Sequence, residues 1–239
     1  MTSPVGARLA SPSKASPSLA AVLAALDTVM DPELDESLLK LGFVQAELLE
    51  GGRVRIEFRL PTYWCAPNFA YLMAGDASEA VRAVEGVREV ELRLTGHFAE
   101  DEVTAGIDDG RTFDDAFAEL ADGGGLEELR RLFWAKSFTM RQERLLRALL
   151  AGGFAESDLA RMRLGQVPDC EELHHYLERR RRLGLAIDAD APLAVMPGGR
   201  AIGAQELAAY LRRARSTRVS MEFNTSLCRG LLETRYPEG

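Results

Sequence analysis

One strand pattern constrains the fold of this chain more than any other feature. Between residues 53 and 60 apolar and charged side chains alternate: the apolar ones are Val54, Ile56, Phe58 and Leu60, and the charged ones are Arg53, Arg55, Glu57 and Arg59. A period of two predicts a strand with one buried face. Because Glu50-Gly51-Gly52 separates this strand from a second candidate strand at Phe43–Leu49, the pair is predicted to form an antiparallel hairpin.

Helical periodicity flanks the hairpin on both sides. Apolar residues recur at helical spacing from Leu19 to Met30, and Pro32 ends that segment. A second helix is predicted over residues 68–84, with Pro67 suited to its first turn. Alternation over Val87–Leu94 then predicts a third strand. The order α-β-β-α-β indicates an α+β domain over residues 17–96, with a three-stranded sheet and two helices on one face.

The rest of the chain divides into three further segments. Residues 1–16 are rich in Ser, Pro and Ala and are expected to be a disordered tail, and residues 97–111 read as an acidic linker. Residues 112–239 are predicted to be mainly helical, with a long helix over 126–150 and a helix over 204–215, followed by a strand over 218–223. No stretch reaches the roughly 18 apolar residues that a transmembrane helix needs.

Composition and charge narrow the range of functions. The chain is 46% hydrophobic and 28% charged, with a formal net charge of -8. An acidic chain is unsuited to a broad nucleic-acid or anionic-membrane surface, so neither is expected as a partner. The three cysteines are an odd and sparse set, which favours the reducing cytoplasm over a disulfide framework.

Cys65 is the residue with the most chemical potential. It lies in a loop that opens the second predicted helix, and Thr62, Trp64 and Pro67 are expected to shape that loop. A thiol at the N-terminal end of a helix is favoured as the thiolate, the form that binds metals and attacks electrophiles. The alternative is a small structural cysteine that packs beside Trp64 and Phe69.

Three carboxylates in the turn after the first helix form a second candidate site. Asp31, Glu33 and Asp35 are spaced closely enough to bind a hard cation or to activate water. The alternative is turn chemistry, in which Asp31 caps the element that follows it.

Two further candidates lie later in the chain. His97 precedes Glu100-Asp101-Glu102, and imidazole with carboxylates suits iron or manganese, although a solvated acidic loop would show the same pattern. Cys228 lies in a segment expected to pass from loop to helix. It would complete a two-cysteine site with Cys65 if the C-terminal segment folds back, and otherwise it is a buried cysteine.

These motifs together resemble a known family. The succession of Asp31-Pro32-Glu33-Leu34, the Leu39–Val44 segment, the hairpin, the Thr62–Pro67 loop and Glu85-Gly86-Val87 is similar to the PaaD/SufT-like iron–sulfur cluster assembly proteins, over about residues 18–95. The chain departs from the family at the loop, where Trp64 replaces the usual Gly and Ala66 separates Cys65 from Pro67. The resemblance implies a role in maturing metalloproteins, with the loop cysteine as a contact to metal or cluster.

A longer form of the family is also similar. Cys65–Ala74 and Cys228–Pro237 resemble segments of accessory factors that accompany soluble di-iron monooxygenases. This resemblance implies an assembly factor rather than an enzyme, with a client metalloenzyme as partner and iron or an iron–sulfur cluster held transiently by Cys65, Cys228 and His97. A single thiolate cannot hold a cluster, so a second ligand or a homodimer is required. A cluster-free chaperone with structural cysteines and a Cys65-dependent enzyme are the two alternatives.

Overall fold

The computed structural model describes residues 16–118 and 125–237. The disordered tail predicted for residues 1–16 therefore lies, apart from its last residue, outside the described residues. Two hydrophobic cores are present, one in the N-terminal domain and one in the helical region that follows it. In the described part of the chain, none of the helices combines the length and the apolar character needed to cross a membrane.

The N-terminal domain confirms the predicted order of elements and the three-stranded sheet. Strands β3 and β4 pair antiparallel, whereas β5 pairs with β4 in parallel after the crossover through α2. A short antiparallel ribbon, β1 with β2, encloses the acidic turn. The elements are α1 Leu19–Asp27, β1 Met30–Asp31, β2 Glu36–Ser37, β3 Val44–Leu49, the 3-10 turn η1 Glu50–Gly52, β4 Arg53–Arg59, α2 Pro67–Arg82 and β5 Glu89–Thr95.

The sheet follows directly from the alternating pattern. Val54, Ile56 and Phe58 are fully buried in the first core. The hairpin requires glycine at its turn, because Gly52 has a φ of 81° and a Cβ there would lie 2.6 Å from the carbonyl oxygen of Gly86. The turn therefore also fixes where β5 approaches β4.

Residues 97–111, expected to be an acidic linker, contain a helix. α3 spans Glu100–Asp108, and its Val103 and Ile107 are buried in the first core. The three acidic residues occupy the first turn of α3, where the helix dipole favours negative charge. The N-terminal domain thus extends beyond residue 96, through α3 and the short helix α4 Phe113–Ala116.

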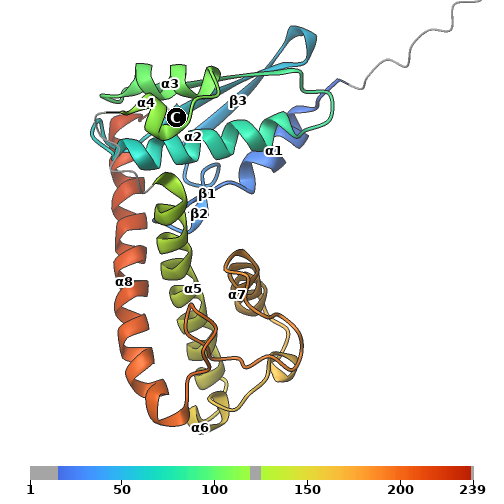
Figure 1. Cartoon of the computed structure of the whole chain (residues 1–239), viewed down its shortest axis with the longest axis vertical. Coiled ribbons are helices and arrows are strands. Elements are labelled where there is room, and N and C mark those ends of the chain that lie inside the picture. The colour runs from blue at the N-terminus through green and yellow to red at the C-terminus, as the bar shows by residue number, and fades with distance from the viewer. Residues whose placement is uncertain (1–15, 119–124, 238–239) are drawn as a thin grey trace, which may run out of the picture.

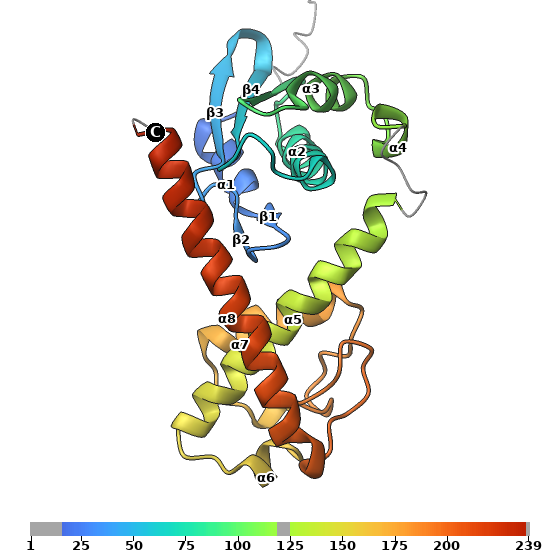
Figure 2. The same cartoon turned by 90° about the vertical axis from the view of Figure 1, so that its left-hand side faces the viewer.

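The helical region consists of two long helices with shorter elements between them: α5 Gly125–Ala151, α6 Glu156–Leu159, the 3-10 turn η2 Leu164–Gln166, α7 Glu171–Arg182 and α8 Ala204–Arg235. The predicted long helix over 126–150 is confirmed as α5. The strand predicted at 218–223 is wrong, because α8 continues unbroken through it for 32 residues. Figure 1 shows α8 running from the far end of the helical region back to the N-terminal domain, and Figure 2 shows α5 and α8 crossing below that domain.

Several sets of polar contacts fix the N-terminal domain on the helical region, among them the pairs of Arg130 with Asp76 and of Arg229 with Glu36. Asp35, at the turn between β1 and β2, accepts hydrogen bonds from Arg141 of α5 and Arg179 of α7, at 2.5 and 2.6 Å. We call these three residues the arginine clamp. At the end of α8, Arg235 donates to the carbonyl oxygens of Leu60 and Gly96. The C-terminal end of α8 is thereby held against the loops that follow β4 and β5.

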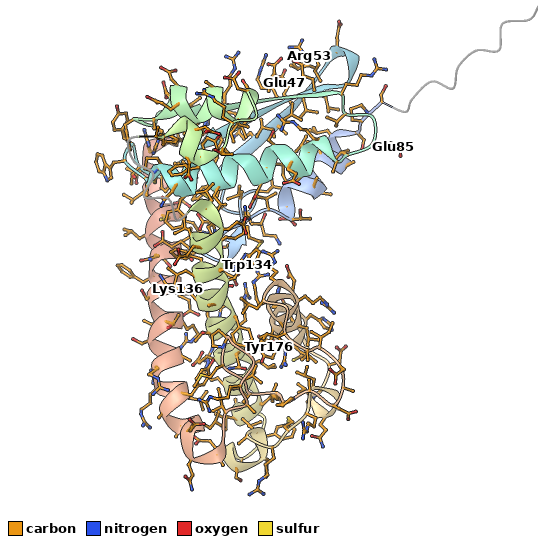
Figure 3. All side chains as sticks on the ribbon, in the orientation of Figure 1. Glu47, Arg53, Glu85, Trp134, Lys136 and Tyr176 are labelled. Carbon is orange, nitrogen blue, oxygen red and sulfur yellow. The ribbon has the colours of Figure 1, made fainter. Side chains whose placement is uncertain are left out.

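The two ends of the sheet differ in their surroundings. Figure 3 shows Glu47, Arg53 and Glu85 at the outer end of the domain, away from α8. The opposite end, where β4 and β5 finish, meets the end of α8. Tyr176 lies inside the helical region, where it is fully buried and donates a hydrogen bond to Gln142 of α5.

Candidate functional site

The loop after β4 places Cys65 two residues before the first residue of α2. Its Sγ lies 3.1 Å from Oγ1 of Thr62, and Pro67 occupies the first turn of α2 as expected. Cys65 itself is partly buried against the first core. Trp64, which stands where the family has Gly, points into solvent with 75% of its surface exposed. The thiol is therefore not covered by the indole ring.

His97 holds this loop from the loop that follows β5. The ring is 98% buried, Nδ1 accepts from the backbone N–H of Ala99 at 3.2 Å, and Nε2 lies 2.7 Å from the carbonyl oxygen of Cys65. This pattern requires the tautomer with hydrogen on Nε2, which then donates to Cys65. Both ring nitrogens are thus engaged, so in this structure His97 positions the Cys65 loop and its role as a metal ligand stays a prediction.

Replacing His97 by Phe is expected to lower the free energy of unfolding by about 1–3 kcal/mol. The substitution leaves the Ala99 N–H and the Cys65 carbonyl without their partner, and an unsatisfied buried polar group costs about that much. Urea unfolding followed by circular dichroism measures the change. His174→Phe is the matched control, because the His174 side chain is 65% exposed and its loss should cost less than about 0.5 kcal/mol. Equal losses in the two variants would contradict the positioning role.

Cys228 belongs to the C-terminal part of the chain but packs against the first core. It lies within α8, not at the start of a helix as expected, and it packs against the first core together with Cys65 and Leu232. Burial, together with smaller contributions from the nearby charges of Asp31, Cys65 and Glu33, raises the pKa of the Cys228 thiol to about 11. Two cysteines 163 positions apart therefore lie within electrostatic reach of each other and of two carboxylates.

Asp31 is the most unusual member of the acidic turn. Its Oδ1 accepts hydrogen bonds from the backbone N–H groups of Glu33 and Leu34, both at 2.8 Å. Asp31 therefore caps the turn that follows it, as the alternative to a cation site predicts. The side chain is only 6% exposed, and burial raises the pKa of its carboxyl to about 7 despite those two hydrogen bonds. Ionised Asp31 is therefore costly in the folded state, so its presence beside Cys228 favours a functional explanation.

Stability should consequently fall as the pH rises. The pKa of Asp31 is about 7 in the folded chain and 3.8 ordinarily, so between these values the folded state binds more protons than the unfolded state. The contribution of Asp31 to the free energy of unfolding is complete below about pH 4 and is lost by about pH 7. Asp31→Asn keeps the accepting oxygen and is expected to raise the free energy of unfolding at pH 8 by roughly 2–3 kcal/mol, with the gain disappearing toward pH 4. A gain that does not change with pH would contradict this assignment.

Asp35 is set apart from the other two acids. It is buried in the arginine clamp, and its backbone has a φ of 55°, a left-handed conformation that Asp tolerates better than most residues. The structure therefore places Cys228 within electrostatic reach of Asp31, Glu33 and Cys65, sets His97 against the backbone of Cys65, and assigns Asp35 to the contact between the two cores.

The arrangement favours a cation or an electrophilic metal centre. Two thiols beside two carboxylates concentrate negative charge once the thiols lose their protons, and a bound metal displaces those protons. Within the described ranges, no group of three or more His, Cys, Asp or Glu side chains is close enough to hold a metal ion. One chain thus offers a pair of thiolates, which is half the cysteine set of an iron–sulfur cluster.

Sequence reasoning missed the partners of Asp35 and the position of Cys228 on a helix. Arg141 and Arg179 carry no local signal that links them to a turn more than 100 residues earlier. For Cys228 the signal was present, since Val219, Phe223, Leu227 and Leu231 recur at every fourth position, as on a helix.

Comparison with known proteins places the first core in a family. Residues 19–92 match the model of the family described as iron–sulfur cluster assembly protein. An uncharacterized protein of Methanocaldococcus jannaschii is 35% identical over 83 residues, which cover 34% of this chain and 85% of that protein. An iron–sulfur cluster carrier protein of Synechocystis is 36% identical over 75 residues, 31% of this chain and 21% of the relative. No solved structure matches the chain significantly.

The match to the family model lies in the N-terminal part of the chain and includes the segment with Asp31, Glu33 and Cys65. The M. jannaschii protein is matched over most of its length, so the shared unit is close to a whole protein there. Through this N-terminal domain, the chain belongs to the iron–sulfur cluster assembly protein family.

Proposed function

We propose that this protein handles an iron–sulfur cluster in the cytoplasm and passes it to a client metalloenzyme. The observation that supports the proposal is the return of α8 to the N-terminal domain, where Cys228 packs against the same core as Cys65 and lies within electrostatic reach of it and of Asp31. Family membership supports the nature of the cargo, and the three free cysteines suit a reducing compartment.

The proposed site has two cysteine ligands and two residues that position their loop. Cys65 and Cys228 supply the thiolates that hold the cargo, while Thr62 and His97 keep the Cys65 loop in place. The raised pKa of Cys228, about 11, means that its thiol carries a proton at neutral pH when no cation is near. Uptake of the cargo then releases that proton, and reprotonation favours release of the cargo to a client.

The client that we propose is a soluble di-iron monooxygenase. Its support is the resemblance of the Cys65–Ala74 and Cys228–Pro237 segments to accessory factors of such enzymes. In the test, the chain is loaded anaerobically with iron and sulfide, separated from free iron, and mixed with the apo-enzyme. We expect enzyme activity to appear with loaded chain and not with an equal amount of free iron and sulfide. Equal activation by the free ions would contradict the proposal.

A client-binding chaperone without cargo is the second candidate. It is favoured by the aromatic side chains exposed beside the site, since Tyr63, Trp64 and Phe98 are 53%, 75% and 46% exposed. The same assay separates the two functions. If the protein is a chaperone, the wild type and the Cys65→Ser variant should promote activation of the apo-enzyme by free iron equally well. A Cys65-dependent enzyme is disfavoured, because His97, the histidine that contacts the loop, has both ring nitrogens engaged and accepts no proton from Cys65.

A further inference from the structure

A cavity lies at the junction of the N-terminal domain and the helical region. Its volume is about 310 Å³, at the lower end of the range for small-molecule sites. The connection from α1 through β1 and the middle of α2 line one side, and α5 and the end of α7 line the other. Figure 3 shows Trp134, one of the lining residues, in the half of α5 nearer the N-terminal domain. We call this space the junction cavity.

The arginines that line the junction cavity already have carboxylate partners. Arg130 donates two hydrogen bonds to Asp76, at 2.6 and 2.9 Å, and Arg182 pairs with Glu178 at 2.8 Å. Asp35, a further acidic residue of the lining, is held by the other two residues of the arginine clamp. The lining arginines are therefore engaged elsewhere and do not neutralise another carboxylate.

Asp31 is the lining residue that lacks a cation. It is only 6% exposed, and in the described chain both hydrogen bonds to its carboxylate, from Glu33 and Leu34, go to Oδ1. Among the described residues, the charges that act on this carboxyl are those of Glu33 and Asp35, both negative. Oδ2 is not sealed inside the protein, and the junction cavity is the open space that Asp31 borders. A nearly buried carboxylate thus presents an unpartnered oxygen to the cavity.

The walls of the junction cavity are suited to an organic cation. Its negative charge disfavours anions, and Met30, Pro32, Leu72 and the indole of Trp134 supply apolar surface for a carbon chain. A metal ion is unsuited, because in the described ranges no three His, Cys, Asp or Glu side chains are close enough to bind one.

The single free oxygen of Asp31 distinguishes between organic cations. A guanidinium group binds both oxygens of a carboxylate, whereas an ammonium group is a compact charge that one oxygen can hold. Backbone N–H groups already occupy Oδ1. We infer that the junction cavity binds the ammonium group of an aliphatic amine on Oδ2 of Asp31, with the carbon chain against Leu72 and Trp134. The exposed carboxylate of Glu79, also on the lining, attracts such a cation from solution.

The test follows binding of n-butylamine to the full chain without cargo, by NMR at about pH 8, where the Asp31 carboxyl is largely ionised. The chain has two tryptophans, and Trp64→Phe assigns their two indole N–H signals. Trp134 lines the cavity, while Trp64 is 75% exposed and serves as the internal reference. We expect the amine to shift the Trp134 signal saturably and to leave the Trp64 signal in place. 1-Butanol has the same carbon chain without the charge and should bind about 10–100-fold more weakly.

Three variants separate the cavity from the acidic surface. Asp31→Asn should bind n-butylamine about 10–100-fold more weakly, the worth of a hydrogen bond to a charged group. Because this variant is expected to be more stable than the wild type at pH 8, lost binding would not reflect unfolding. Asp27→Asn makes the same change at the end of α1, outside the cavity lining, and should bind the amine as the wild type does. Ala80→Leu keeps the charge of Asp31 but fills space from α2, so it should also weaken binding.

A free amine and the lysine side chain of a partner share this chemistry, and a capped Gly-Lys-Gly peptide distinguishes them. A peptide that binds more tightly than n-butylamine assigns the ammonium group to a partner's lysine, and a weaker peptide assigns it to a free amine. Both results support the site.

The inference is overturned if the Trp134 signal does not move, if 1-butanol binds as tightly as the amine, or if Asp31→Asn or Ala80→Leu binds like the wild type. Because the assay contains no iron or sulfide, none of these results bears on the proposed function, which the site extends.

Discussion

Asp35→Asn is expected to lower the free energy of unfolding by about 3–5 kcal/mol, the usual cost of removing one partner from a buried ion pair. The carboxylate is 96% buried and faces two guanidinium groups, and Arg179 is itself only 1% exposed. Asn keeps the shape of the side chain and tolerates the left-handed backbone at this position, so the substitution isolates the charge. Arg141 would lose its carboxylate partner, and the buried Arg179 would keep only Glu178 as a carboxylate partner.

Equilibrium unfolding in urea measures this loss. Trp134 on α5 lines the cavity of about 310 Å³ that also borders Asp35, so its fluorescence reports on this contact. Glu47→Gln is the control, because the Glu47–Arg55 pair lies at the surface and its loss should cost less than about 1 kcal/mol. If Asp35→Asn costs no more than Glu47→Gln, the clamp does not hold the two cores together.

Cys228→Ser and Cys65→Ser should each lower affinity for the iron–sulfur cluster by about 100-fold or more. Even a group that only supports a ligand is worth about 10–100-fold in metal affinity, and a serine hydroxyl does not ionise near neutral pH to replace a thiolate. The measurement is the iron and acid-labile sulfide retained per chain after anaerobic loading and gel filtration.

Cys170→Ser is the matched control for both variants. Cys170 precedes the first residue of α7 and packs against the second core, apart from Cys65 and Cys228. The Cys170→Ser variant should therefore retain the wild-type amount of iron–sulfur cluster. Equal losses in all three variants would indicate nonspecific binding to thiols, and no loss in Cys228→Ser would remove α8 from the site.

Much of the N-terminal fold could be predicted because its signals are local. The alternation over β4, the glycines of the turn and the helical periods on either side each specify an element without reference to distant residues. The helix α3 was missed because its acidic first turn suggested a linker, although Val103, Gly106 and Ile107 are spaced as on a helix face. The strand predicted at 218–223 failed for a related reason, since Val219, Met221 and Phe223 satisfy a period of two over a short window.

The candidate site could be predicted only in part. The Cys65 loop and the Asp31 turn lie within one domain whose order of elements is readable, so their meeting follows from the fold. Whether Cys228 joins them depends on the course of a 32-residue helix and on its last turn, where Arg235 binds backbone carbonyls. Backbone carbonyls are present at every residue, so no sequence pattern marks that contact in advance. The same holds for Arg141 and Arg179, two of many arginines in the helical region.

The central claim is that Cys65 and Cys228 hold the cargo together at the junction of the N-terminal domain and α8. Anomalous diffraction at the iron absorption edge, from crystals of the anaerobically loaded protein, tests it most directly because it locates iron without assuming its ligands. The account predicts that the strongest iron peak lies between Sγ of Cys65 and Sγ of Cys228. An iron peak elsewhere in the molecule, with both thiols free, would contradict it.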